Sequence, residues 1–502
     1  MKPFRRRWAE LAPKSDNTPT VAVIAGGVAG LATALDIRDR ARDAGLDVKV
    51  TVFEKGSEPG GNLQTIRQDG WQLEWGPNGF LDNEPATLRL VDRLELRDKL
   101  QRSSDATAHR FLLIDGRIQE IPVSPKAFLK SSMMSTGAKL RMAGELFVPP
   151  RKDLGRAAED PSTDETIEQF GARRLGQTFA DIMLDPMVKG VFGGDARRLS
   201  LAAAFPRMIE LEKDYGGLFK AMIKLSRQKK KEGKSKTDAG PSGVLHSFTG
   251  GMATLIDAMV ADLAADPLAE VRVNAEVQKI SPTEDGWLVS ATDGDHGPFD
   301  AVVEAAPAHA AAGHLGHLDP VFADHLAAIP FAPMAVIALG FKREAVTHDL
   351  NGFGMLVPTR EKRELLGALW TSSIFGGRAP DGRVLIRCMA GGSANPGFME
   401  QTDEEMTAVL LSEMRPLFGL KGAPDMVRVI KHERAIAQYV PGHLARLKEL
   451  DRATAAFPGL FLTGSSYRGI SVNNCVKEAE TIAENVLKGL ADKHDHARSE
   501  AV

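Results

Sequence analysis

The sequence contains very little cysteine and no long apolar run. Its 502 residues include only two cysteines, Cys388 and Cys475. Two are too few for a disulfide framework or a metal cluster, and such sparse use suits a reducing cytoplasm. No uninterrupted apolar stretch approaches the roughly 18 residues that a spanning helix needs. We therefore expect no metal site, no disulfide-stabilised secreted domain and no integral membrane protein.

An excess of charge is also missing. The net charge of −3 at pH 7 argues against nucleic acid as the main partner. The basic start, residues 1–8, lacks the apolar region of a secretory signal, and we predict that residues 1–17 form a disordered tail. No Ser/His/Asp or Cys/His constellation stands out, so the sequence nominates no catalytic side chain. The length and 43% hydrophobic content instead predict a soluble protein of two or three domains.

A strand–turn–helix–strand unit stands out between residues 21 and 54. An apolar run, Val21-Ala22-Val23-Ile24, leads into a glycine turn containing Gly26, Gly27 and Gly30, and a second apolar run ends at Glu54. The positive N-terminus of the helix can hold a pyrophosphate. Gly27 lets the phosphate approach the backbone, Gly30 lets helix and strand pack closely, and Glu54 can accept hydrogen bonds from a ribose. The unit predicts Rossmann-like dinucleotide binding; the alternative is a glycine-rich turn in an ordinary α/β unit.

Ala25 departs from this pattern, because it replaces the first glycine of G-x-G-x-x-G. Alanine costs nothing there if its φ is negative, and on the order of 1 kcal/mol if its φ is positive. Further along, Gly60-Gly61 allow a second close approach of the backbone, and Gly76-Pro77 follow about fifteen residues later. This arrangement resembles the FAD-binding start of the amine-oxidase-like flavoproteins. Taken alone, Gly60-Gly61 could equally be a surface turn.

The rest of the chain alternates helical and strand-like patterns. We predict a helix over 85–101 in which Arg97 is near the end, and a hairpin over 111–121 around Asp115-Gly116. A helical region over 125–225 leads into a mobile basic loop at 227–243. Strands over 271–307, a β-rich region over 334–393, helices at 250–263 and 403–417, and a final helix to Val486 complete the pattern. Residues 491–502 are predicted to be a disordered tail.

Several blocks together resemble the oxygen-dependent protoporphyrinogen oxidases, with the similarity running from about residue 20 to 490. They are GVFGGD (190–195), FP (205–206), ELE (210–212), GFGMLVP (352–358), SSIF (372–375), RAP (378–380), QYVPGH (438–443) and YRGI (467–470). The resemblance implies an α/β (α+β overall) fold in three parts. They are a discontinuous FAD-binding domain (18–95, 245–315 and 440–490), a β-rich substrate-binding domain (96–124 and 316–439) and a helical membrane-associated domain (125–244).

The resemblance also implies the chemistry and the substrate residues. FAD would accept hydride from a porphyrinogen, and O2 would reoxidise the flavin to give H2O2. Leu356, Leu369 and Met389 would sandwich the macrocycle, and the Gly190 backbone would face its pyrrole nitrogens; ordinary core packing is the alternative for the three apolar side chains. Methionine stands at 389 where the family often has an aromatic residue. Arg97 matches an arginine that grips a substrate propionate; alternatively it bonds the helix end or pairs with Asp98.

For the cofactor, the resemblance carries over the glycines and Glu54 named above and adds residues further along. These are Gly76, Pro77, Val277, Gly464, Ile470, Ser471 and Val472. Ser465-Ser466 depart from the family pattern, in which an asparagine commonly follows the glycine. The neighbours of Cys475 do not match a flavin-linking cysteine, so non-covalent FAD and a buried thiol are expected.

The sequence leaves other functions open. Close relatives of this fold oxidise coproporphyrinogen III, which a more polar cavity would favour. An FAD amine oxidase would need an aromatic cage, for which the three tyrosines, Tyr215, Tyr439 and Tyr467, are few. A non-catalytic flavin- or porphyrin-binding protein is a third alternative. Expected partners are a porphyrinogen and O2, with ferrochelatase and a second copy of the chain as further candidates. We expect peripheral attachment to the cytoplasmic face of the cell membrane.

Overall fold

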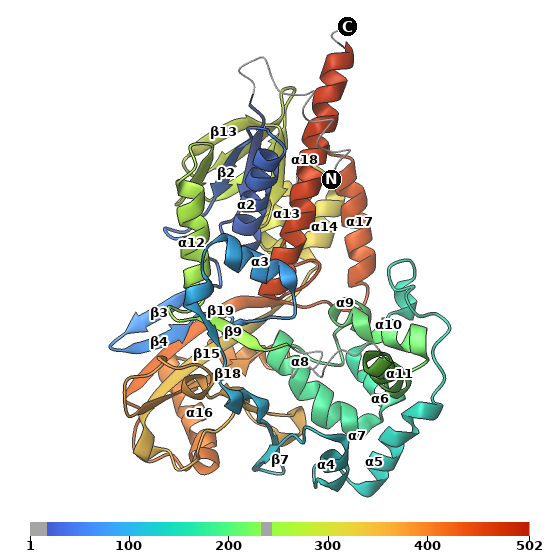
Figure 1. Ribbon diagram of the computed structural model, residues 1–502, viewed down its shortest axis with the longest axis vertical. Coiled ribbons are helices and arrows are strands. Elements are labelled where there is room, and N and C mark those ends of the chain that lie inside the picture. Colours follow the sequence, from blue (N-terminus) through green and yellow to red (C-terminus); the bar gives the residue numbers. More distant parts are fainter. Residues whose placement is uncertain (1–17, 232–242, 501–502) are drawn as a thin grey trace.

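A parallel sheet forms the centre of the upper part of the molecule (Figure 1), and the computed structural model describes residues 18–231 and 243–500. Its five strands run in the order β10-β2-β1-β14-β20. They are β1 (Thr20–Ile24), β2 (Lys49–Phe53), β10 (Ala269–Arg272), β14 (Ala301–Glu304) and β20 (Leu460–Leu462). Because three separate stretches of chain supply these strands, their carboxyl ends bring distant residues to one edge of the sheet.

Both faces of this sheet are covered. Val21 and Val23 face a core with helices, whereas Ala22 and Ile24 face a core with a β-meander, because side chains alternate along a strand. The helical layer contains α2 (Val28–Asp43), α3 (Pro85–Arg93), α12 (Ala253–Ala264) and α18 (Val472–Glu500). The other layer contains β11 (Val277–Pro282), β12 (Trp287–Ala291), β13 (Gly294–Phe299), α13 (Ala308–Leu315), α14 (Pro320–Ala327) and α17 (His443–Ala455). Burial on both faces explains the uninterrupted apolar run of β1.

A second, seven-stranded sheet forms the lower part of the molecule, in the order β19-β15-β18-β17-β16-β7-β8. Its strands are β7 (Arg110–Ile114), β8 (Arg117–Glu120), β15 (Phe331–Lys342), β16 (Gly354–Leu356), β17 (Leu365–Leu369), β18 (Arg383–Gly391) and β19 (Met426–Ala437). Helix α16 (Asp403–Phe418) packs on one face through Met406, Leu410 and Met414. The hairpin predicted around Asp115-Gly116 is confirmed, and both turn residues have positive φ.

Short strands and turns connect the two sheets. They are β3 (Thr65–Gln68), β4 (Trp71–Glu74), β5 (Phe80–Leu81), β6 (Leu100–Arg102), β9 (Leu245–Phe248) and the helical turn α15 (Thr371–Ile374). Strand β9 pairs with β5 and β6, so the chain entering α12 is tied to the segment that follows β4. The pairing of β9 with β5 and β6 therefore joins the chain before and after the helical region to the rest of the molecule.

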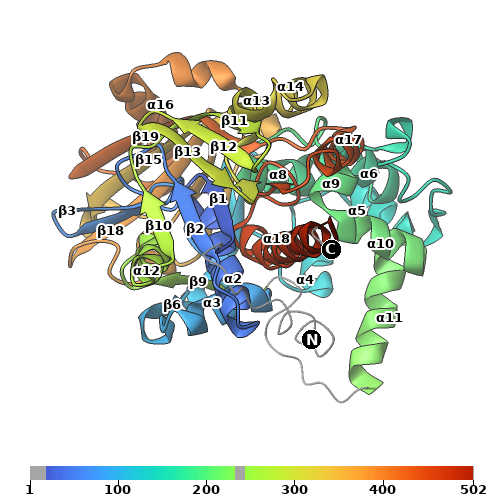
Figure 2. The same cartoon turned by 90° about the horizontal axis from the view of Figure 1, so that it is seen from above.

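The helical region lies beside the second sheet, and α11 projects from it (Figures 1 and 2). Its helices are α4 (Pro125–Lys130), α5 (Thr136–Ala143), α6 (Ile167–Arg174), α7 (Gln177–Phe179), α8 (Asp185–Phe192), α9 (Leu201–Ala204), α10 (Pro206–Tyr215) and α11 (Leu218–Lys231). A π-helical turn, Ala180–Leu184, leads into α8. The predicted helical character of 125–225 is confirmed.

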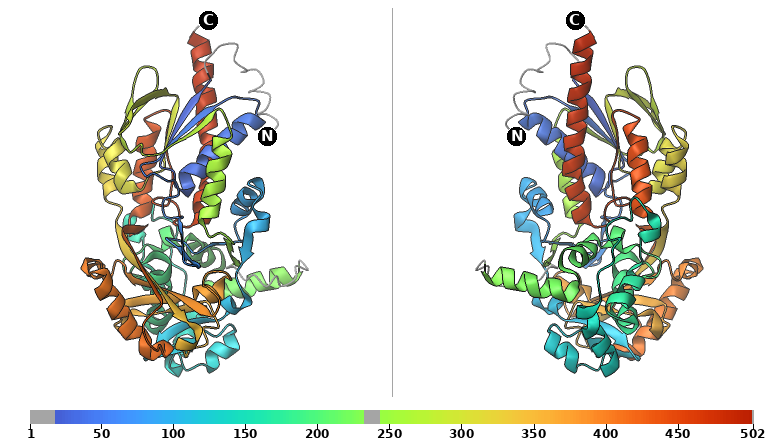
Figure 3. Two further views of the ribbon diagram at one scale, coloured as in Figure 1. Left: turned by 90° about the vertical axis from the view of Figure 1, so that its left-hand side faces the viewer. Right: turned by 90° about the vertical axis from the view of Figure 1, so that its right-hand side faces the viewer.

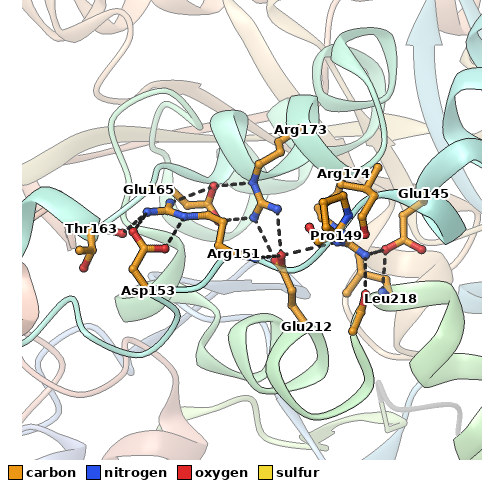
Figure 4. Close-up of polar contacts among 12 residues, drawn as sticks. Glu145, Pro149, Arg151, Asp153, Thr163, Glu165, Arg173, Arg174, Glu212 and Leu218 are labelled. Atoms are coloured by element: carbon orange, nitrogen blue, oxygen red, sulfur yellow. Dashed lines mark hydrogen bonds and ion pairs between the residues drawn. The ribbon is translucent and has the colours of Figure 1, made fainter.

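A buried ionic network holds these short helices together (Figure 4). Glu145 binds Arg174, and both side chains are inaccessible to solvent. Glu145 also accepts the Leu218 N–H at 2.8 Å, which starts α11. Arg173 makes a two-point contact with Glu212 at 2.8 and 2.9 Å. Glu212 belongs to the ELE block, so this motif residue has a structural role in the helical region.

Three predicted boundaries are wrong. Helix α3 ends at Arg93, well before residue 101, because Glu95 takes a left-handed φ of 53° and Leu96 N–H closes the end on Val91 O. The first part of the predicted basic loop, 227–231, continues α11, while 232–242 lie outside the described residues. Helix α18 runs to Glu500, whereas 491–502 were expected to be disordered; Figure 3 shows its length beside the sheet.

The predicted N-terminal tail, 1–17, lies outside the described residues, as do 501–502. Within 18–231 and 243–500, no helix has the length and apolar character needed to cross a membrane.

Candidate functional site

The glycine turn after β1 has the geometry of a phosphate-binding loop. Ala25 has a φ of 81°, so the costly one of its two predicted conformations is present. A Cβ atom on Gly30 would overlap the Ala25 carbonyl oxygen, which shows why the helix can approach the strand only at a glycine. A Cβ atom on Gly27 would meet nothing within 4 Å. Packing therefore requires Gly30, whereas the space beside Gly27 remains open for a ligand.

Glu54 lies at the centre of a group of backbone amides. Its carboxylate accepts the N–H of Gly26 and the N–H of Gly56, each at 2.8 Å, and the residue is 8% exposed. Gly60 N–H donates to Gly26 O at 2.8 Å, so the second glycine pair packs against the first turn. Gly61 has a φ of 56°, which favours glycine. The structure thus brings together five of the predicted cofactor residues, namely Gly26, Gly27, Glu54, Gly60 and Gly61, and each Glu54 oxygen keeps a lone pair for a ribose hydroxyl.

The loop that follows β20 reaches the same edge of the sheet. Gly464 has a φ of 116°, and a Cβ atom there would lie 3.3 Å from the Ala305 carbonyl oxygen. Ala305 N–H in turn bonds Ile24 O at 3.0 Å, directly before the glycine turn. Ile470, Ser471 and Val472 continue this loop into the N-terminus of α18. Val277 begins β11 and is buried; its predicted contact with adenine stays a prediction.

Gly76 and Pro77 lead to a residue that the sequence did not single out, Asn78. Arg387 Nη2 donates to Gly76 O at 2.5 Å, which anchors this segment on β18. Both polar atoms of the Asn78 amide are buried, and neither has a hydrogen-bond partner among the described residues. An amide in that state is costly unless a ligand or water satisfies it. The only sequence signal for Asn78 is its position directly after Gly76-Pro77.

Four of the five predicted substrate residues lie in one apolar group. A Cβ atom on Gly190 would lie 2.8 Å from Leu356 Cδ2, and a Cβ atom on Gly367 would lie 2.9 Å from the same atom and 3.5 Å from Met389 Cε. Gly367 also pairs with Met389 across β17 and β18. Leu369 packs with Met389. The second sheet therefore presents these side chains to the end of α8, with glycines where the packing is closest.

Buried charges lie close to this apolar group. Arg387 shares the β18 face of Met389, and burial lowers its pKa to about 10. Arg378 lies 3.7 Å from Glu74, and both are almost inaccessible. Burial raises the pKa of Glu74, although Arg378, Thr65 Oγ1 and the Met252 N–H oppose this shift. In the sequence, Arg378 stands out only as part of the RAP motif, and nothing singles out Arg387.

Arg97 is not brought to this group. It lies in a 3₁₀ turn, Arg97–Lys99, and forms an ion pair with Asp92 in which both side chains are 51% exposed. The alternative prediction, that Arg97 pairs with Asp98 at the surface, is wrong. Helix α3 ends early, and this turns Arg97 back toward Asp92. Its substrate role stays a prediction.

The two cysteines are buried, as expected for Cys475. Burial raises the pKa of the Cys475 thiol to about 12, so it is a poor nucleophile at neutral pH. Cys388 donates to Met414 Sδ at 3.1 Å inside the second core.

The residues of this edge fit a flavin dinucleotide. The space beside Gly27 is open, the two glycine turns pack together, and the segment that carries the unsatisfied Asn78 amide is tied by Arg387 to β18, the strand of Met389. A dinucleotide with a flat ring system at one end suits these features, because the phosphates need backbone N–H groups and the ring needs apolar walls.

Comparisons with known proteins agree with this assignment. Residues 28–487 match the family model described as "Flavin containing amine oxidoreductase". The chain is 32% identical to "Protoporphyrinogen oxidase, mitochondrial" of Nicotiana tabacum, covering 95% of this chain and 96% of that protein. It is 27% identical to "Coproporphyrinogen III oxidase" of Bacillus subtilis, covering 94% and 99%. The solved structure of "Putative protoporphyrinogen oxidase" from Exiguobacterium sp. 255-15 matches with a TM-score of 0.76 at 22% identity, covering 94% and 99%, which shows a shared fold.

Proposed function

Because the chain belongs to the family of flavin containing amine oxidoreductases and is an FAD-dependent oxidoreductase, we propose that it oxidises protoporphyrinogen IX to protoporphyrin IX in haem biosynthesis, with O2 as the acceptor. The observation that carries the proposal is the apolar group in which Leu356 lies against Gly190 and Leu369 packs with Met389 on the adjoining strands. A flat macrocycle with few polar substituents suits such walls. The names of the relatives from N. tabacum and B. subtilis support the same class of substrate.

The chain's own residues bind and orient in this proposal. FAD, when bound, would accept hydride from the macrocycle in three successive two-electron rounds, each followed by transfer of the electrons to one O2 to give one H2O2. Gly27 and Gly61 admit the pyrophosphate, Glu54 holds the ribose, and the loop from Gly464 to Val472 contacts phosphate and flavin. The amide of Asn78 satisfies a polar edge of the flavin or the substrate. Leu356, Leu369 and Met389 exclude water around the carbon that loses hydride.

Coproporphyrinogen III is the second candidate substrate, since the B. subtilis relative carries that name at 27% identity. It has propionates where protoporphyrinogen has two vinyl groups. Leu369 and Met389 pack with Phe353, Ile374 and Phe375, and the guanidinium groups of Arg110 and Arg378 lie over the rings of Phe353 and Phe375 at 5.6 and 5.3 Å. We prefer protoporphyrinogen because apolar side chains form this group, and turnover on both substrates tests whether the arginines accept extra propionates.

The test is aerobic turnover of the purified protein on both porphyrinogens, following porphyrin fluorescence and H2O2. We expect the higher kcat/KM for protoporphyrinogen IX, and yellow protein from which acid precipitation releases FAD. A higher value for coproporphyrinogen III would reverse the substrate assignment. Turnover of amines without porphyrinogen oxidation would establish an amine oxidase instead. Flavin binding without any turnover would support a non-catalytic binding protein.

We further propose that the tip formed by α4, α5 and the turn after them rests on a membrane surface. Four apolar side chains project from it, namely Val123 (83% exposed), Leu129 (55%), Leu140 (70%) and Phe147 (87%). Lys126 and Lys130 are exposed on α4 beside them. Apolar side chains with flanking lysines suit the interface of an anionic bilayer. This surface supports peripheral attachment more directly than the basic segment 227–243 that was predicted from the sequence.

Sedimentation with anionic vesicles tests the membrane surface. We expect Leu140→Glu with Phe147→Glu to abolish binding, and Val427→Glu, which replaces an exposed valine on β19, to preserve it. High salt or carbonate should release the parent protein from membranes. A need for detergent, or equal binding by the double variant, would refute this surface. The cytoplasmic location, the ferrochelatase contact and the homodimer stay predictions, which fractionation and cross-linking would test.

A further inference from the structure

The segment Gln438–His443 joins three parts of the molecule that are distant in the sequence. It follows β19 of the second sheet and leads into α17. The site as described above uses none of its side chains. Its polar contacts reach the helical region on one side and the loop after β20 on the other.

Gln438 holds the end of the helix that carries Gly190. Its side chain is 3% exposed, and Nε2 donates to Phe192 O at 2.8 Å and to Ile436 O at 3.0 Å. Phe192 is the last residue of α8, where backbone carbonyls lack partners within the helix. A Cβ atom on Gly194 would lie 2.6 Å from Gln438 Oε1, so the amide is closely enclosed. Gln438 thus sets where α8 ends relative to the second sheet.

Tyr439 holds the loop after β20. Its ring is 1% exposed, and Oη donates to Ser465 O and accepts from Gly469 N–H, both at 2.8 Å. The hydroxyl therefore bridges two points of the loop between Gly464 and Ile470. On its backbone side, Tyr439 O accepts the Ser200 N–H at 2.8 Å, which ties the same residue to the helical region.

His443 supports Tyr439. The two rings stack with centroids 4.2 Å apart and planes 17° from parallel. His443 Nε2 donates to Tyr467 O at 2.8 Å, a third contact with the same loop. Burial lowers the pKa of His443 to about 4, so the ring is neutral at working pH and has a proton for that bond. The loop is therefore held at Ser465, Tyr467 and Gly469 from one side.

We propose that Gln438 and Tyr439 are positioning residues for the two halves of the active site: Gln438 places the substrate helix α8, and Tyr439, backed by His443, places the flavin loop. Two adjacent residues would then set the distance between macrocycle and flavin. The proposal rests on the proposed function, because Gly190 and the loop from Gly464 to Val472 take their roles from it.

Tyr439→Phe tests the flavin half. Removing the hydroxyl leaves Ser465 O and Gly469 N–H without partners, so we expect the FAD dissociation constant to rise at least about tenfold, or about 1.4 kcal/mol. With FAD saturating, KM for the porphyrinogen should change by less than about twofold. Tyr215→Phe is the control, because it makes the same chemical change on α10, which contributes no residue to the flavin loop or to the apolar group. FAD affinity of that variant should match the parent.

Gln438→Leu tests the substrate half and should show the opposite pattern. We expect KM to rise about fivefold or more while the FAD dissociation constant changes by less than about twofold. His443→Phe keeps a stacked ring but loses the bond to Tyr467 O, so it should weaken FAD as Tyr439→Phe does. If Tyr439→Phe does not fold, His443→Phe replaces it in the measurement of FAD affinity. Thermal unfolding of each variant shows whether the fold is intact.

Two results would overturn the proposal. One is equal FAD affinity in Tyr439→Phe and Tyr215→Phe. The other is the same combination of changes in Gln438→Leu and Tyr439→Phe, which would indicate general loosening rather than separate positioning. Failure of the proposed function is seen in the parent, which would then bind no FAD or oxidise no porphyrinogen. A parent that binds FAD but oxidises no porphyrinogen still lets the FAD measurements decide the role of Tyr439.

Discussion

The carbonyl oxygen of Ala25 occupies the space that a Cβ atom on Gly30 would need. This contact sets how closely α2 approaches β1, and it distinguishes two glycines that the sequence motif treats alike. Gly30 serves helix packing, whereas Gly27 faces open space.

We therefore expect Gly30→Ala and Gly27→Ala to fail in different ways. Gly30→Ala should destabilise the FAD-free protein by about 1–3 kcal/mol, because the helix must move away from the strand. Gly27→Ala should leave the FAD-free protein nearly as stable as the parent but weaken FAD binding, since its methyl group enters the phosphate site. Urea unfolding of the FAD-free protein and FAD titration measure the two effects. Loss of stability in Gly27→Ala without loss of FAD affinity would contradict this division.

Ala25→Gly should stabilise the protein slightly. The left-handed conformation costs alanine about 1–2 kcal/mol, whereas the extra freedom of glycine in the unfolded chain costs about 0.4–1 kcal/mol, so a small net gain remains. FAD affinity should be equal or tighter. The same change in the middle of α2, Ala34→Gly, should destabilise, because that residue is helical and fully buried. Clearly weaker FAD binding by Ala25→Gly would show that the methyl group is needed for packing.

The role of Arg97 can be separated from its ion pair with Asp92. If Arg97 grips a substrate propionate, Arg97→Ala should raise KM for the porphyrinogen about tenfold, with a smaller change in kcat and unchanged FAD content. Arg97→Lys should recover only part, because an ammonium lacks the planar fork. Asp92→Ala is the control, since it frees Arg97 and should leave KM equal or lower. Parent-like kinetics of Arg97→Ala would remove Arg97 from the site.

Asp36 makes stability depend on pH. Burial raises the pKa of this α2 carboxyl from 3.8 to about 6, with Arg40 opposing and Glu480 reinforcing the shift. Between about pH 4 and 6, Asp36 is still protonated in the folded protein but already ionised in the unfolded chain. The free energy of unfolding therefore falls as pH rises through this range. Asp36→Asn should raise the free energy of unfolding near pH 8 by up to about 3 kcal/mol and change it little near pH 4. Asp47→Asn, on the surface after α2, should have no such difference.

The buried pair of Glu145 and Arg174 should matter far more than a surface pair. Glu145→Gln removes one of the two buried carboxylates of Arg174 and leaves Glu212 at 3.5 Å, so the loss should approach the lower end of the about 3–5 kcal/mol typical of a broken buried pair. Glu210→Gln breaks the exposed pair with Arg207 on α10 and should change stability little. Thermal unfolding of both variants measures the contrast. Equal effects would show that Glu212 and the backbone carbonyl contacts suffice to hold the Arg174 charge.

Local patterns in the sequence were sufficient for several elements. The β1–α2–β2 unit with Glu54, the hairpin at Asp115-Gly116 and helices α12 and α16 follow from apolar periodicity and turn residues within short windows, and all are present. The same windows placed Gly26, Gly27, Gly60 and Gly61 at one ligand, since a glycine's permissiveness is a local property. Gly190, Leu356, Leu369 and Met389 were predicted from the resemblance of sequence motifs to a known family, not from apolar periodicity.

The sequence by itself thus determined the class of fold and the dinucleotide motif, because both arise from interactions between near neighbours. The tertiary structure alone decided the sign of φ at Ala25, the pairing of Arg97 with Asp92, the unsatisfied amide of Asn78 and the bridge from Tyr439 to Gly469. Each of these features depends on contacts between residues that are distant in the sequence or on the exact residue at which a helix ends. Arg387, for example, meets Gly76 from 311 residues away. No local pattern specifies such a contact, because it exists only after the sheets have packed.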